Sequence, residues 1–138
     1  MKIPRYKSPE AQKLYDKADE VFELVDALNA VIPEDVDIQQ SMGRQMLDCA
    51  MNILAKIIGA EAGRLWDIKM EHAALIRYYG NGIIHGCISL DMLDFEHQSY
   101  LNIVREKMDE FKVLYKDWVN TFDPTLSYED EWGLFNPP

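Results

Sequence analysis

Two glutamates at helical spacing, Glu20 and Glu23, are the residues whose types and positions most directly suggest chemistry. Residues three apart lie on one face of a helix, where two carboxylates can share a divalent cation. Magnesium-dependent nucleotide hydrolases of this kind need a second carboxylate pair on a facing helix. The nearest candidates, Asp91 and Asp94, fall in a predicted connection rather than within a helix. A metal-dependent nucleotide hydrolase acting through Glu20 and Glu23 is therefore an alternative, and two solvated acids are the preferred interpretation.

The three histidines, His72, His85 and His97, complete no metal or catalytic motif. A di-iron bundle needs two Glu-x-x-His pairs, and only His97 has an acid three positions before it. Cys49 and Cys87 lie in apolar surroundings with no adjacent cation, so they are predicted to be reduced thiols of the core. The sequence accordingly predicts no catalytic residue, no cofactor and no metal ligand.

Acidic side chains outnumber basic ones, 24 to 14, which gives a net charge of −10. Non-specific nucleic-acid binding needs a cationic surface, so the charge makes nucleic acid an unexpected partner. Seven acids and no base lie between Asp19 and Asp37. The simplest interpretation is a solvated helix face and loop, and the functional one is a surface for a basic protein partner. The candidate interaction residues of this surface are Asp19, Glu20, Glu23 and Asp26.

The composition is that of one ordinary globular domain, with 48% hydrophobic and 28% charged residues in 138. No uncharged apolar run reaches the roughly 18 residues that a membrane span requires. No apolar segment follows the charged residues at the start of the chain, as it would in a secretory signal. We therefore expect a cytoplasmic protein that does not associate with membranes.

Apolar residues recur at spacings of three and four in four long segments, which is typical of amphipathic helices. Ser8-Pro9-Glu10 has the pattern of a helix start, and Asp94 is the predicted cap of the last helix. The predicted segments are about 9–32, 37–63, 65–90 and from Asp94 to Phe122. Four such helices with short links predict an all-α, antiparallel up-and-down four-helix bundle. The predicted divisions are an N-terminal arm (1–8), the bundle (9–122) and an extended acidic and aromatic tail (123–138).

The third segment contains Gly80 and Gly82, which weaken a helix. Because the apolar periodicity continues in phase across them, one long helix is preferred to a turn between two shorter ones. Stripes of small residues on the second and third helices predict close helix packing, within the chain or between subunits. These residues are Ala55, Gly59, Gly63, Gly82 and Gly86.

The tail contains three large apolar residues in a chain end that is expected to fray, Trp132, Leu134 and Phe135. The simpler interpretation is that they fold back on the bundle and cover an apolar stripe. The alternative is that they dock on a neighbouring subunit or on another protein.

One segment of the second helix resembles a known family. Ala50-Met-Asn-Ile53-Leu-Ala55-Lys-Ile57, followed by Gly63-Arg64, is similar to the second helix of the "four helix bundle protein" family. This family comprises proteins from intervening sequences of bacterial 23S rRNA genes and the accessory protein of diversity-generating retroelements. The family proline and asparagine are replaced by Leu54 and Lys56. The resemblance implies an up-and-down bundle that forms a homo-oligomer, a pentamer in characterised members, and no enzymatic activity.

The function expected from the sequence is therefore a non-enzymatic, homo-oligomeric helical-bundle scaffold or adaptor that binds another macromolecule. An accessory protein of a retroelement-like system, associated with nucleic acid, is an alternative that the resemblance suggests and the negative charge disfavours.

Overall fold

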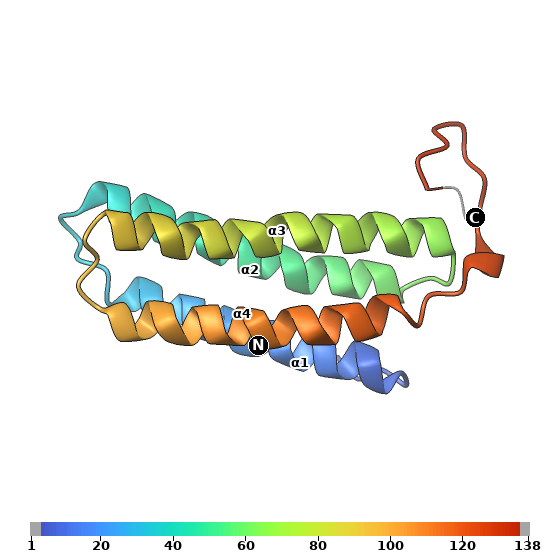
Figure 1. Cartoon of the computed structure of the whole chain (residues 1–138), viewed down its shortest axis with the longest axis horizontal. Coiled ribbons are helices and arrows are strands. Elements are labelled where there is room, and N and C mark those ends of the chain that lie inside the picture. Colours follow the sequence, from blue (N-terminus) through green and yellow to red (C-terminus); the bar gives the residue numbers. More distant parts are fainter. Residues whose placement is uncertain (1–3, 136–138) are drawn as a thin grey trace.

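The chain folds into four long helices, as the computed structural model of residues 4–135 shows (Figure 1). Its elements are α1 (Pro9–Ala30), α2 (Asp37–Glu61), α3 (Trp66–Met92), α4 (Gln98–Val119) and the short 3-10 helix η1 (Pro124–Leu126). This confirms the predicted all-α four-helix bundle. The extreme parts of the predicted arm and tail, residues 1–3 and 136–138, lie outside the described residues.

Each long helix packs against two neighbours, and the contacts join α1 to α2, α2 to α3, α3 to α4 and α4 to α1. Within residues 4–135, the backbones of the diagonal helices do not come close to each other, although the side chain of Trp118 on α4 reaches Glu61 at the end of α2. Short connections make successive helices antiparallel, so the topology is up-and-down (Figure 1). The 27 residues of α3 correspond to about 40 Å at 1.5 Å per residue, which makes the bundle a rod with a large lateral surface.

The ends of α1 follow the local sequence. Ser8 is the N-cap, and its Oγ accepts a hydrogen bond from the N–H of Ala11 at 3.2 Å. Proline occupies the first helical position, where its missing N–H costs nothing. At the other end the helix stops at Ala30, three residues before Pro33.

The third helix continues without interruption through Gly80 and Gly82, so the prediction of one long helix is correct. The predicted limits of the fourth helix are wrong at both ends. Asp94 adopts a left-handed conformation (φ 58°) just after α3 and does not cap α4, which begins at Gln98. The helix ends at Val119, because Asp123 and Pro124 start a separate 3-10 turn.

Close packing occurs at three of the five predicted small residues, and the atoms that approach belong to the same chain. A Cβ added at Gly59 would lie 2.7 Å from Nε2 of His72, and one at Gly82 would lie 2.7 Å from Sγ of Cys49. One added at Gly86 would collide with the side chain of Met46. Side chains thus insert against the glycine backbones where α2 and α3 pack together.

The prediction of close packing is wrong for the other two residues, Gly63 and Ala55. A Cβ at Gly63 would meet no atom within 4 Å, because Gly63 lies beyond the end of α2 in the connection to α3. Ala55 is exposed on the outer face of α2. Gly43, which the small-residue spacing did not select, is a tight position, since its Cβ would lie 2.5 Å from Cδ1 of Ile32.

Candidate functional site

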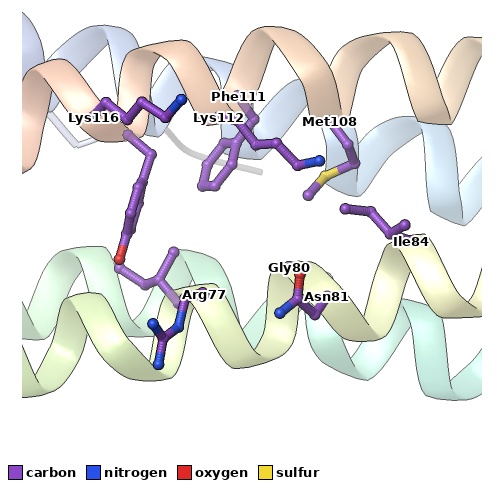
Figure 2. A pocket seen from close by; sticks show the side chains of 10 residues that line it. Arg77, Gly80, Asn81, Ile84, Met108, Phe111, Lys112 and Lys116 are labelled. Atoms are coloured by element: carbon purple, nitrogen blue, oxygen red, sulfur yellow. The ribbon is translucent and has the colours of Figure 1, made fainter.

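A groove between α3 and α4 is the candidate functional site (Figure 2). It encloses about 210 Å³ near the middle of the bundle and is open to the surface. The α3–α4 pair makes the least extensive contact of the four neighbouring helix pairs. The groove lies where these two helices are least tightly joined. Hereafter, "the α3–α4 groove" denotes this site.

The floor of the α3–α4 groove is apolar. It is formed by Ile76, Gly80 and Ile84 of α3 and by Met108 and Phe111 of α4. Gly80 occupies a seam position that a larger apolar residue would otherwise fill. A Cβ added there would lie 3.4 Å from Cε of Met108, so the missing side chain leaves room directly above the floor.

The rim of the α3–α4 groove is cationic. Arg77 lies on α3, while Lys112 and Lys116 lie on α4 on the opposite side (Figure 2). Lys112 is 3.9 Å from Asp109, an exposed pair that contributes little. Between residues 4 and 135, neither Arg77 nor Lys116 has an acidic side chain within ion-pair distance. None of the ten residues that line the groove is acidic.

Tyr115 joins the two helices at the groove. Its hydroxyl donates a hydrogen bond of 2.6 Å to the carbonyl oxygen of Ala73, which connects α4 to α3. Burial raises the pKa of Tyr115, and the charge of Arg77 acts in the opposite direction. The phenol is therefore a neutral donor at physiological pH. This bond joins the two walls of the groove.

The arrangement suits binding of an anionic and apolar group. An apolar floor favours apolar side chains, and the cations at the rim favour carboxylates. The described lining holds no histidine, cysteine, serine or carboxylate that would act as a nucleophile or general base. The features that the groove does show, an apolar floor and a cationic rim, are those of a binding surface.

The sequence alone does not predict this groove. Lys112 and Lys116 lie among the polar residues of the last helix, and Arg77 stands in no recognisable motif. The available signal was Gly80, a glycine at a seam position between apolar residues. Its spacing predicts a gap in the core face of α3, although it does not reveal which helix lies opposite.

The predicted acidic surface is divided by the structure. Asp19 is buried, with 9% of its surface exposed, and burial raises the pKa of its carboxyl group. Glu20 forms ion pairs with Lys17 at 2.8 Å and with Lys107 at 3.3 Å. The hydrogen bond from Lys17 is the main cause that lowers the pKa of Glu20. Glu23 and Asp26 are exposed. Of the four candidate interaction residues, the structure therefore buries Asp19, pairs Glu20 with lysines and leaves the other two at the surface.

The carboxylates that the hydrolase alternative requires are not brought together. Glu20 and Glu23 lie on α1, whereas Asp91 lies at the end of α3, diagonal to α1 and without contact to it. Asp91 instead lies 3.7 Å from Arg105 of α4. Within residues 4–135, no three His, Cys, Asp or Glu side chains are grouped so that they could hold a metal ion.

The apolar residues of the tail do not cover the bundle. Trp132 is 89% exposed and Leu134 is 75% exposed, while Phe135 is half-buried. The prediction that all three fold back over an apolar stripe is therefore wrong. The tail nevertheless contacts the bundle, because η1 packs against α3 and Oδ1 of the buried Asp67 accepts a hydrogen bond from the N–H of Tyr128 at 2.8 Å.

Both cysteines are free thiols, as predicted. Cys87 is buried, and burial raises the pKa of its thiol to about 11. Cys49 is half-buried against α3, and burial raises the pKa of its thiol too.

Cys87 is expected to react slowly with thiol reagents in the native protein. A rise of the thiol pKa from 9.0 to about 11 lowers the reactive thiolate fraction near pH 8 about 100-fold, before steric protection is counted. Disulfide-exchange kinetics with a Cys49→Ser variant, native and in urea, measure this ratio for Cys87 alone. Equal native and unfolded rates would contradict the prediction.

Comparison of the chain with protein-family models, with curated proteins and with solved structures gave no match. In the part of the chain that the structure describes, no helix has the length and apolarity needed to cross a bilayer.

Proposed function

We propose that this protein is a non-enzymatic helical-bundle adaptor that acts as a homo-oligomer and binds protein segments carrying both acidic and apolar side chains. The observation that carries the proposal is the α3–α4 groove. Its floor is apolar and its rim holds Arg77, Lys112 and Lys116, although the whole chain has a net charge of −10. A local cationic site on an acidic protein attracts an anionic ligand specifically, because the rest of the surface repels it.

Exposed apolar side chains outside the groove support self-association. Met51 and Ile58 on the outer face of α2 are 48% and 46% exposed. On α3, Tyr78 and Met92 are 70% and 78% exposed. Apolar surface of this kind is typical of interaction faces. The resemblance to the four helix bundle protein family, whose characterised members are pentamers, points in the same direction.

The groove is tested with a fluorescein-labelled peptide of alternating glutamate and leucine, followed by anisotropy at low salt. We expect the double variant Lys112→Glu and Lys116→Glu to bind the peptide at least about tenfold more weakly, because two attractive charges become repulsive. The matched control is Lys7→Glu with Lys13→Glu, which changes the net charge equally at exposed positions outside the groove. It should retain most of the affinity.

Two results would overturn the proposal. One is equal weakening of peptide binding by both charge-reversed double variants, which would mean that only the overall charge matters. The other is absence of peptide binding by the wild-type chain. A peptide with lysine in place of glutamate should not bind, and it controls for adsorption to apolar surface.

A further inference from the structure

We propose that the α3–α4 groove of one molecule binds the C-terminal tail of a second copy of this chain. This inference rests on the proposed function, because it identifies the acidic and apolar segment that the groove receives. It also supplies a contact by which the homo-oligomer forms. The evidence comes from the chemistry of the tail, from its exposure and from the point at which it is attached.

The tail carries the side chains that complement the groove. Glu129, Asp130 and Glu131 precede Trp132 directly, and Leu134 follows. Three acids next to two large apolar residues match three cations beside an apolar floor. Within this acidic chain, such a match in both charge and apolar character favours pairing of these two surfaces.

The structure presents the tail for binding. Oδ1 of Asp130 accepts hydrogen bonds from the N–H groups of Trp132 at 3.0 Å and Gly133 at 2.9 Å. Gly133 has a φ of 60°, which glycine adopts without strain. This turn holds Trp132 and Leu134 outward, with 89% and 75% of their surfaces exposed. Exposing two such side chains to water is unfavourable, and a partner surface would relieve that cost.

The attachment of the tail favours a groove on another molecule. The Tyr128–Asp67 hydrogen bond holds the tail at the first turn of α3. The middle of the groove, at Gly80, lies about 20 Å further along that helix, whereas the extended backbone from Tyr128 to Trp132 spans at most about 14 Å, so Trp132 of the same chain reaches only the near end of the groove. The tail also stands on the side of α3 that is turned away from α4 (Figure 1). A second copy can bring its groove to the exposed tail without breaking the anchor.

The test uses full-length chains and measures mass by light scattering during size exclusion. Two variants are each expected to shift the protein from an oligomer to a monomer at tens of micromolar. The tail variant is Trp132→Ala with Leu134→Ala, and the groove variant is Lys112→Glu with Lys116→Glu. All four residues are exposed, so these chains should fold, which circular dichroism confirms. The control, Ile38→Ala with Ile103→Ala, removes two exposed apolar residues that lie outside the groove and the tail, and it should keep the wild-type mass.

Mixing the two defective variants gives the decisive measurement. The tail variant retains an intact groove, and the groove variant retains an intact tail. One tail can then enter one groove, so an equimolar mixture is expected to form a 1:1 complex that neither variant forms alone. Formation of that complex supports exchange between molecules.

Failure of this inference is distinguishable from failure of the proposed function. A wild-type monomer at several hundred micromolar, an unchanged mass in the tail variant, or no complex in the mixture would overturn tail exchange. If the groove still binds the glutamate–leucine peptide in those cases, the proposed binding of acidic and apolar segments stands and the identity of the occupant is wrong. A wild-type monomer would also overturn the homo-oligomer that the proposed function includes. If the peptide does not bind, both the tail exchange and the proposed function are wrong.

Discussion

Replacement of Glu61 by alanine is expected to lower the free energy of unfolding by about 3 kcal/mol, because it leaves two buried donors without an acceptor. Oε2 of Glu61 accepts a hydrogen bond of 2.8 Å from Nζ of Lys69 and one of 3.2 Å from Nε1 of Trp118. The side chains of Glu61 and Lys69 are only 13% and 16% exposed, and Trp118 is 1% exposed. This one carboxylate therefore connects the end of α2 to the start of α3 and the end of α4.

The size of the effect follows from what remains after the substitution. The Trp118 indole N–H would lose its only acceptor within the described residues. The ammonium of Lys69, which also lies 5.2 Å from the centre of the Phe122 ring, would lose its carboxylate. Burying an unpaired charge costs more than the pair contributed, so deletion of one partner is more harmful than an average surface change.

Urea unfolding followed by Trp fluorescence and by circular dichroism measures this loss. Glu61→Gln should lie between the wild type and the alanine variant, because the amide oxygen can still accept from Trp118. The exposed Glu71 of α3 provides the control, and Glu71→Ala should change stability by less than about 0.5 kcal/mol. A Glu61→Ala variant as stable as Glu71→Ala would contradict the role of this carboxylate.

The second large effect is expected at Gly86, where alanine should destabilise the protein by about 2 kcal/mol although it is the better helix former. A Cβ at Gly86 would lie 2.6 Å from Sδ of Met46 and would also collide with its Cγ. Met46 is 1% exposed, so its side chain cannot turn outward into solvent to relieve this contact. Overpacking then exceeds the roughly 1 kcal/mol that helix propensity returns.

The same substitution at Gly80 is the matched control. Gly80 lies in the same helix, but its Cβ would make an ordinary contact of 3.4 Å with the flexible end of Met108. Gly80→Ala should therefore be neutral or stabilising by up to about 1 kcal/mol. Thermal or urea unfolding should show that Gly86→Ala lowers the free energy of unfolding and that Gly80→Ala does not. Equal changes in the two variants would mean that the α2–α3 packing is looser than described.

Much of the fold was predictable because its signals are local. The spacing of Leu101, Val104, Met108 and Phe111 identifies a buried helix face without knowledge of the partner, and these residues are buried. The start of α1 at Ser8 and Pro9 was also predictable, because a cap depends on a few adjacent residues. The limits of α4 were not predictable. Asp94 has the sequence pattern of an N-cap, but its backbone adopts a left-handed conformation before the helix begins.

The candidate site was not predictable to the same extent. Arg77 and Lys116 are separated in sequence, and each has the pattern of an ordinary solvated cation when its own helix is considered alone. The small-residue stripes show the same limit. Gly59 and Gly63 have identical spacing signals, yet His72 approaches only the first of them. Equal patterns thus have different outcomes, depending on the length of the helix and the position of its neighbour.

By itself, the sequence determined the number of helices, their order and the face that each buries, because a period of 3.6 residues is a property of one helix. The tertiary structure alone decided that Asp19 is buried, that Trp132 is exposed and that an apolar groove opens beside Gly80. These features depend on the offset and separation of neighbouring helices. Such quantities are determined by how side chains of different helices interlock, and no periodicity within a single helix encodes them.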